Sequence, residues 1–268
     1  MTKIAALQTV SGTDVARNLS AAASLIATAA AEGATLLALP EYFCLMGQRD
    51  SDKLAVAEVD GNGPIQDFLA AQARQHRVWL IGGTLPIRGT APDHARNACC
   101  VYGPDGMRVA RYDKIHLFRF DNGRESYDEA RVLEAGDSPV ALQAGPLRVG
   151  LSICYDLRFP ELYRALCTPA PCDVLSVPAA FTYTTGRAHW ELLLRARAVE
   201  NQCYVLAAAQ GGTHENGRRT WGHSMIVDPW GDVLAVKPEG EGVVVAEIDA
   251  DRLAAVRRQL PALSHRRL

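Results

Sequence analysis

The chain has 268 residues, of which 48% are apolar and 22% are charged, and its net charge is −2. These values are ordinary for a soluble globular protein with a sizeable core, and they give no electrostatic attraction to nucleic acid or anionic membranes. No apolar segment reaches the roughly 20 residues that span a bilayer, and the N-terminus has the pattern of a strand rather than of a signal peptide. We therefore predict a cytoplasmic protein that binds neither nucleic acid nor membranes.

The first half of the chain alternates apolar strands with helices. Asp14 suits the N-cap of a helix that Gly33 ends, because a short polar side chain caps the first turn and glycine adopts the conformation that closes the last. In chain order the pattern predicts strands at 4–10, 36–40 and 78–86, with helices at 14–33 and 65–77 between them, and then a hairpin that turns at 103–106.

The second half repeats this order. It predicts strands at 147–154, 173–181 and 203–210, helices at 161–167 and 188–202, a hairpin at 224–236, a strand at 243–249 that closes the sheet, and a last helix at 249–260. Duplicated strand–helix units imply two mixed sheets, each with helices on one face. The predicted fold is an α/β, four-layer α-β-β-α sandwich built from two duplicated halves, and residues 1–268 form one domain.

Seven cysteines are present, an odd number without the spacing of a disulfide scaffold, so we expect reduced thiols. Cys167 and Cys172 could form half of a zinc site, but no second pair at ligand spacing accompanies them. We therefore expect no metal.

One cysteine stands out by its position. Cys154 ends a predicted buried strand and precedes a sharp turn into a helix, at the carboxyl end of a strand where ligands collect in such folds. The turn leaves the backbone N–H of Tyr155 free to face a developing oxyanion. The alternative is that Cys154 is a small hydrophobic side chain of the core.

Two further residues could work with this thiol. Glu41 directly follows the apolar strand at 36–40, and a carboxylate with buried neighbours suits a general base near neutrality. Lys114 lies on an extended segment, two residues from His116, so both face one way; an ammonium group there could stabilise a thiolate and an oxyanion. Glu41 could instead be a solvated loop residue, Lys114 an edge residue, and His116 the base of a Cys–His hydrolase.

Three segments together resemble the nitrilase superfamily of carbon–nitrogen hydrolases: LALPEYF, YDKIHLF and GLSICYDLRFPELYRAL. The resemblance covers essentially the whole chain. It implies a Glu–Lys–Cys triad at Glu41, Lys114 and Cys154, and a second glutamate at Glu129, with Glu125 left open. It also implies the sandwich fold, pairing into homodimers or larger assemblies, and no cofactor, because the thiol supplies the nucleophile. His116, His189 and His223 are then expected to be packing residues.

Within the superfamily, CYDLRFPEL, RARAVENQCYV and the ending QLPALSHRR resemble the branch that hydrolyses deaminated glutathione. The implied substrate is a small 2-oxo acid amide. Arg158 is a candidate for its carboxylate, because a guanidinium binds a carboxylate in a two-pronged way, although it could instead pair with Glu161. The resemblance adds Phe181 and Thr185 to the pocket. Three alternatives remain: an ω-amidase acting on α-ketoglutaramate, a true nitrilase, and a catalytically silent binding protein of the same fold.

Overall fold

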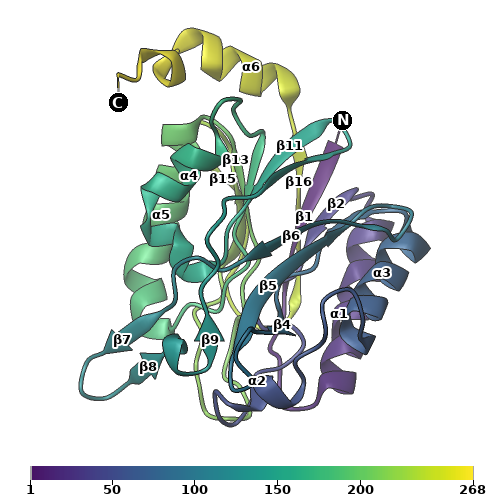
Figure 1. Cartoon of the computed structure of the whole chain (residues 1–268). Helices are drawn as coiled ribbons and strands as arrows, with labels where there is room; N and C mark the ends of the chain where they lie inside the picture. Colours follow the sequence, from purple (N-terminus) through teal and green to yellow (C-terminus); the bar gives the residue numbers. More distant parts are fainter. Residues whose placement is uncertain (1, 268) are drawn as a thin grey trace.

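The computed structural model describes residues 2–267, in which two β-sheets lie between two layers of helices. In Figure 1, α1 and α3 lie on the right, α4 and α5 on the left, and the sheets between them. The predicted four-layer sandwich is therefore confirmed. The helices are α1 (Val15–Ala31), α2 (Asp52–Ala55), α3 (Pro64–His76), α4 (Pro160–Leu166), α5 (Tyr183–Asn201) and α6 (Ala250–Gln259), with 3₁₀ turns at Glu129–Arg131, Cys154–Arg158 and Ala262–His265.

The two sheets share one plan. The first contains β1 (Thr2–Gln8), β2 (Leu36–Ala38), β3 (Trp79–Ile81), β4 (Leu85–Arg88), β5 (Ala95–Tyr102), β6 (Arg108–Asp113), β9 (Leu133–Glu134) and β16 (Gly242–Ile248). The second contains β10 (Ala141–Ala144), β11 (Leu147–Leu151), β12 (Val174–Ser176), β13 (Tyr204–Ala207), β14 (Ser224–Val227) and β15 (Val233–Lys237). Each has three parallel strands, β1-β2-β3 and β11-β12-β13, flanked by antiparallel neighbours, which bears out the duplication.

The side chains of β1 alternate between two apolar cores, one on each face of its sheet. Ile4 and Ala6 belong to the core between the two sheets, whereas Ala5 and Leu7 belong to the core beneath α1 and α3. Successive side chains of a strand point to opposite faces, so the middle of a strand between two layers is apolar on both sides. Both sets of parallel strands follow this pattern, with polar residues such as Arg148 near the strand ends.

Several strands are shorter than predicted, and two predicted strands differ from the structure in number or in pairing. The segment 78–86 is two strands, β3 and β4, because Gly82 and Gly83 interrupt it; Gly83 has φ +58° and a Cβ there would lie 2.2 Å from the carbonyl oxygen of Pro40. The strand at 243–249 does not close the second sheet. As β16 it pairs antiparallel with β1 and so ties the end of the chain to its beginning.

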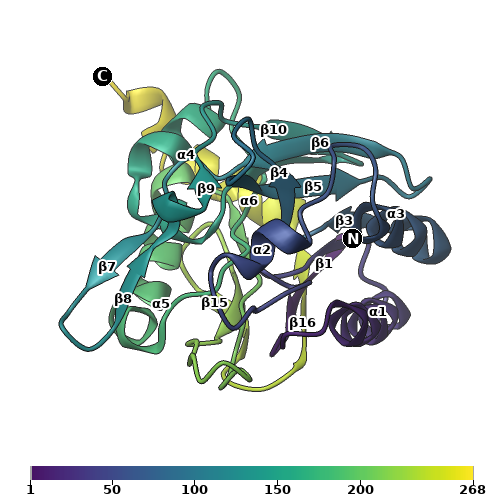
Figure 2. The same cartoon turned by 60° about the horizontal axis from the view of Figure 1, so that its bottom comes forward.

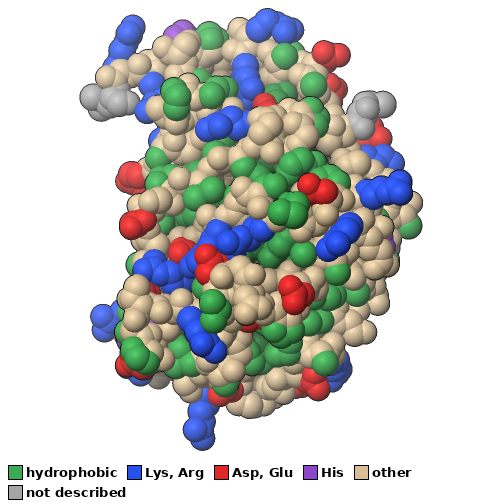
Figure 3. Space-filling model, turned by 45° about the vertical axis from the view of Figure 1, so that its right-hand side comes forward, with side chains coloured by type: hydrophobic (Ala, Val, Ile, Leu, Met, Phe, Trp, Pro, Cys, Tyr) green, Lys and Arg blue, Asp and Glu red, His purple; other side chains and the backbone are tan. Residues whose placement is uncertain are grey.

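A hairpin that the sequence analysis did not predict, β7 (Arg119–Asp121) and β8 (Ser126–Asp128), projects from the body in Figures 1 and 2. On the face drawn in Figure 3, Lys and Arg side chains lie beside Asp and Glu side chains, among hydrophobic ones. Among residues 2–267, no helix combines the length and the apolar character that crossing a membrane requires.

Candidate active site

The three residues singled out in the sequence lie just beyond the ends of three strands. Glu41 follows β2, Lys114 follows β6 directly, and Cys154 follows β11. The strands come from both sheets, and the turns after them converge on one pocket. Lys114 is thus past the strand end rather than within it, so it does not share a strand face with His116 as predicted.

Lys114 forms the centre of a buried ionic cluster. Its Nζ lies 2.9 Å from Glu41 Oε1 and 2.8 Å from Glu129 Oε2, and the side chains of Lys114 and Glu41 are each 1% exposed. Burial alone would lower the pKa of Lys114, but the charges of Glu129 and Glu41 outweigh it and hold the pKa above its ordinary value. The ammonium group therefore stays charged at neutral pH.

Cys154 is held in a strained backbone conformation beside this cluster. Its φ is +48°, a region that non-glycine residues rarely occupy, and its N–H donates to the carbonyl of Pro178 at 2.8 Å. Burial raises the pKa of the thiol, and Glu41 raises it further through its charge and a hydrogen bond, against the opposing effect of Lys114. The thiol is therefore protonated at neutral pH, with a carboxylate within reach of its proton.

Backbone and side-chain donors fix both carboxylates. Glu41 accepts from Asn97 Nδ2 at 2.8 Å and from the N–H of Ala180 at 2.9 Å. Glu129 accepts from the hydroxyl of Tyr42 at 2.7 Å and from the N–H of Phe118 at 2.8 Å. Both carboxylates are thus oriented toward Lys114 rather than free to turn.

The second glutamate beside Lys114 is Glu129. Glu125 lies in the turn of the β7–β8 hairpin, where it accepts from the hydroxyl of Thr184 at 2.9 Å. The sequence could not separate the two because they are only four residues apart in an irregular segment.

Asp156 organises the turn that carries Cys154. Its buried carboxylate accepts from the N–H of Ile153 at 2.9 Å, from the hydroxyl of Tyr112 at 2.7 Å and from the N–H of His116 at 3.0 Å. His116 Nδ1 lies 2.7 Å from the same carboxylate, and its ring stacks on Phe159 at 3.7 Å. The partners of His116 are therefore Asp156 and Phe159.

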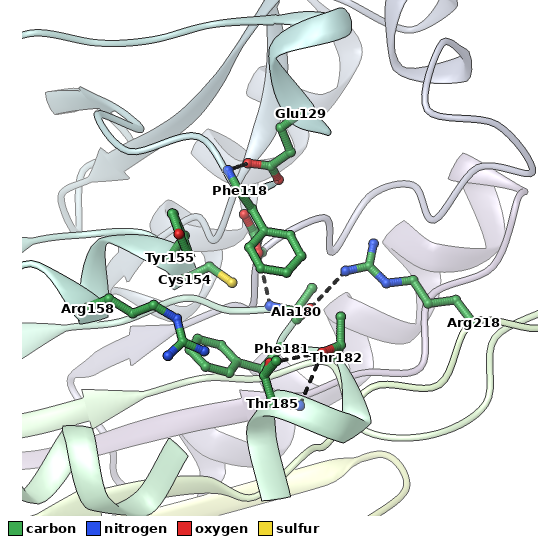
Figure 4. A pocket seen from close by; sticks show the side chains of 11 residues that line it. Phe118, Glu129, Cys154, Tyr155, Arg158, Ala180, Phe181, Thr182, Thr185 and Arg218 are labelled. Carbon is green, nitrogen blue, oxygen red and sulfur yellow. Dashed lines mark hydrogen bonds between the residues drawn. The ribbon is translucent and has the colours of Figure 1, made fainter. Parts of the chain in front are cut away.

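A narrow pocket opens onto the thiol. Figure 4 shows Arg158 and Arg218 on opposite sides of it, with Cys154 and Phe118 between them. The lining residues are Glu41, Phe118, Glu129, Cys154, Tyr155, Arg158, Ala180, Phe181, Thr182, Thr185 and Arg218. Every site residue predicted from the sequence except Lys114 therefore lines this pocket, and Lys114 lies behind it, bonded to the two glutamates.

Arg158 packs between rings and does not pair with Glu161. Its guanidinium lies 5.4 Å from the ring centre of Phe181 and 5.8 Å from that of Tyr155, and its Nη1 lies 3.2 Å from His189 Nδ1. Within the part of the chain that the structure describes, no carboxylate forms an ion pair with Arg158. Thr185 lies in the first turn of α5, where its Oγ1 is 2.9 Å from Thr182 Oγ1.

The other cysteines form no metal site. Cys167, Cys172 and Cys203 share hydrogen bonds among their thiols, and these bonds lower the pKa of the half-buried Cys167. Across residues 2–267 no group of three or more His, Cys, Asp and Glu side chains could hold a metal ion.

Sequence reasoning missed three residues that shape the site: Asn97, Asp156 and Arg218. Asn97 had a detectable signal, since it is a polar residue that directly precedes the apolar run 98–102 of β5, and a buried amide needs a partner. Asp156 and Arg218 lie in turns, where polar residues are ordinary, so nothing in the local pattern marks them.

Comparison with known proteins gives one consistent family. The family model described as carbon–nitrogen hydrolase matches residues 3–258. The chain is 43% identical over 267 residues to the deaminated glutathione amidase of Synechocystis sp., covering 98% of this chain and 97% of the relative. It is 39% identical over 252 residues to omega-amidase NIT2 of Homo sapiens, covering 93% and 89%. The crystal structure of Saccharomyces cerevisiae Nit3, a member of branch 10 of the nitrilase superfamily, superposes with a TM-score of 0.88 at 30% identity, covering 97% of this chain and 94% of that one.

Proposed function

The chain belongs to the carbon–nitrogen hydrolase family, and from this membership we propose that it hydrolyses the amide bond of deaminated glutathione to 2-oxoglutarate and Cys-Gly. One observation carries the proposal: a buried thiol, Cys154, lies beside a carboxylate, Glu41, that is paired with an ammonium group, Lys114. These are the parts that amide hydrolysis through a thioester needs, namely a nucleophile, a base and a cation for the oxyanion.

The first half-reaction forms an acyl-enzyme. Glu41 takes the proton of Cys154 as Sγ bonds to the amide carbon and the carbonyl electrons move onto oxygen. The raised pKa of the thiol makes this base necessary, because little thiolate is present at neutral pH. Lys114 and the N–H of Tyr155 stabilise the oxyanion, and losing one such donor costs about 10²–10³ in kcat. The C–N bond then breaks as Glu41 returns its proton to the leaving amine, which leaves a thioester on Cys154 and completes the first half-reaction.

The second half-reaction releases the acid. Glu41 then takes a proton from a water molecule as that water attacks the thioester, and the proton passes to the departing thiolate. Glu129 keeps Lys114 in position through two oxygen contacts at 2.8 and 3.0 Å. The thiol supplies the nucleophile, so no cofactor takes part.

The acyl half of the substrate lies against Arg158, Phe181 and Thr185. Arg158 offers a charge without a carboxylate partner, which suits a 2-oxo acid, and Phe181 supports its flat guanidinium face. Arg158→Ala should therefore raise KM for a 2-oxo acid amide more than it lowers kcat.

A second candidate function is that of an ω-amidase on α-ketoglutaramate, which the similarity to omega-amidase NIT2 supports. The two substrates share the acyl half and differ in the leaving group. Measuring kcat/KM for both with the same preparation decides between them, and we expect the larger value for deaminated glutathione.

Cys154→Ala tests the nucleophile. We expect turnover below detection and no thioester in a quenched reaction, while circular dichroism and the melting temperature stay close to those of the wild type. Turnover retained in this variant would contradict the assignment. A wild type that binds these amides without cleaving them would instead support the catalytically silent binding protein.

We also propose that the enzyme works in the cytoplasm, as one domain over residues 1–268, and as a homodimer or larger assembly.

A further inference from the structure

A second, wider hollow adjoins the catalytic pocket and is rich in positive charge. It has a volume of about 570 Å³, against about 10 Å³ for the catalytic pocket. We call it the basic hollow; its charged residues are Arg49, Asp50, Lys53, Arg124, Glu125, Arg218 and Arg219. Five cations thus face two carboxylates, in a protein whose net charge is −2. Such a local excess favours an anion.

Some of these charges are already neutralised. Lys53 pairs with Asp50 at 3.1 Å, and Arg219 pairs with Glu239 at 2.8 Å while stacking on a tyrosine ring. Within residues 2–267, no carboxylate lies within 4.0 Å of the guanidinium groups of Arg49, Arg124 and Arg218. The uncompensated charge of the basic hollow therefore resides on three arginines.

Arg218 connects the two cavities, since it lines both. Its Nη2 donates to the carbonyl of Ala180 at 3.0 Å, and its guanidinium lies 5.0 Å from the ring centre of Tyr127, so the group is fixed in place. Its Nε is buried and has no hydrogen-bond partner. A fixed guanidinium with unused donor capacity at a cavity boundary suits a carboxylate.

The position of Arg218 relative to the thiol indicates which half of the substrate this residue would contact. Figure 4 shows Arg218 across the pocket from Arg158, with Cys154 between them. If the acyl half lies toward Arg158, the leaving amine points toward Arg218. Because Arg218 lines both cavities, a bulky leaving group on this side of the thiol would reach the basic hollow.

We propose that the basic hollow, with Arg218 at its entrance, binds a carboxylate on the leaving amine. The enzyme would then act on amides that carry a carboxylate on both sides of the scissile bond, one for Arg158 and one for Arg218. Amides that release a carboxylate-bearing peptide gain this contact, and those that release ammonia do not. The inference rests on the proposed function and extends it to the leaving group.

The test compares deaminated glutathione with the same compound whose terminal carboxylate is replaced by a carboxamide. The acyl half and the scissile bond are identical, so the ratio of their kcat/KM values isolates the second carboxylate. We expect a wild-type ratio of about tenfold or more, because a charge-assisted pair is lost with the carboxamide. In Arg218→Gln the ratio should fall to about one.

Two variants serve as controls for this ratio. Arg219→Gln removes a neighbouring charge that is already paired, and Arg158→Gln weakens binding of the acyl half that both compounds share. Both should leave the ratio at its wild-type value. Arg218→Lys, which keeps the positive charge but loses the two-pronged geometry of the guanidinium, should retain part of the wild-type ratio.

Three outcomes would overturn the inference. A wild-type ratio of one would show that the terminal carboxylate is not bound, and this reading does not depend on any variant folding. A ratio that persists in Arg218→Gln, or one that collapses in Arg158→Gln instead, would place the contact elsewhere. In each case turnover of deaminated glutathione leaves the proposed function intact. Absence of turnover for both compounds would contradict the proposed function itself, and the inference with it.

Discussion

At the scale of single residues, Lys114 illustrates how a buried charge is maintained. It has two carboxylate partners, Glu41 and Glu129, and each carboxylate has further hydrogen-bond donors. A buried ion is stable only when its partners are well placed and are themselves satisfied. The cluster carries one negative charge in excess, which the N–H groups of Ala180 and Phe118 help to offset.

Lys114→Met removes the central cation of this cluster. We expect loss of activity and a free energy of unfolding lower by about 3 kcal/mol at neutral pH, because the buried carboxylate of Glu41 and the mostly buried carboxylate of Glu129 lose their counter-ion. Lys53→Met is the matched control, since Lys53 is also buried but its partner Asp50 is solvent-exposed; it should cost about 1 kcal/mol or less. Chemical denaturation measures both, and equal losses would contradict the special status of Lys114.

The same variant should change how stability depends on pH. In the wild type, burial raises the pKa of Glu129, but Lys114 and the hydrogen bonds outweigh it and lower the pKa below its ordinary value. Glu129 then stabilises the fold above about pH 4, and this contribution is lost as pH falls through the folded-state pKa. Without Lys114, burial prevails and raises the pKa of Glu129 above its ordinary value. Any stabilisation of the fold by Glu129 is then present only at low pH and is lost as pH rises. The difference between wild type and Lys114→Met should therefore be largest at neutral pH and shrink toward pH 4, and a constant difference would contradict this account.

At the scale of elements, the turn after β11 presents Cys154, the proposed nucleophile. A residue at positive φ persists only where its surroundings hold it there. Here the N–H of Cys154 is bonded to Pro178, and Asp156 joins the turn to β6 and to the segment after it. The position of the thiol thus depends on a carboxylate that is two residues away.

Asp156→Asn should test this dependence. The amide has the same shape but replaces one acceptor with a donor, which would face N–H or O–H donors. We expect a loss of about 1–3 kcal/mol in stability and a fall in kcat, since Cys154 would shift. Asp228→Asn is the control: Asp228 is also buried and accepts from the N–H groups of Trp230 and Asp232, but in a distant turn. It should lose stability while keeping kcat, and an equal loss of kcat in both variants would contradict a positioning role for Asp156.

At the scale of the whole molecule, the duplicated halves leave β15 as the edge of the second sheet. Val233, Leu234 and Val236 on this strand are 37–45% exposed, and Val199 of the adjoining α5 is 47% exposed. An exposed apolar edge strand invites association, and the family resemblance predicts that copies of the chain pair.

Leu234→Asp should therefore weaken self-association. We expect sedimentation velocity to give a dimer or larger assembly for the wild type and a smaller species for the variant, because a charge would be buried at the contact. Met107→Asp is a suitable control, since Met107 is 66% exposed in a turn of the first sheet. A wild type that stays monomeric at micromolar concentration would contradict the predicted pairing.

Much of the fold and the family could be predicted from the sequence, because their signals are local. Apolar runs of strand length, the cap at Asp14 and the stop at Gly33 depend on neighbouring residues. The cap, the stop and the strand after them were found where the pattern placed them, whereas the run at 78–86 is two strands. The family was identified from three motifs, and the family match over residues 3–258 confirms it. The positions of helices and strands follow from patterns of neighbouring residues, and a duplicated pattern implies duplicated sheets.

Only the tertiary structure decided which polar groups meet. It joined β16 to β1, separated Glu129 from Glu125, directed His116 to Asp156, and placed Arg218 across the pocket from Arg158. These contacts join residues from turns whose local sequence is ordinary. Their energies depend on distance and burial, which arise when the two sheets pack, so no window of the sequence contains them.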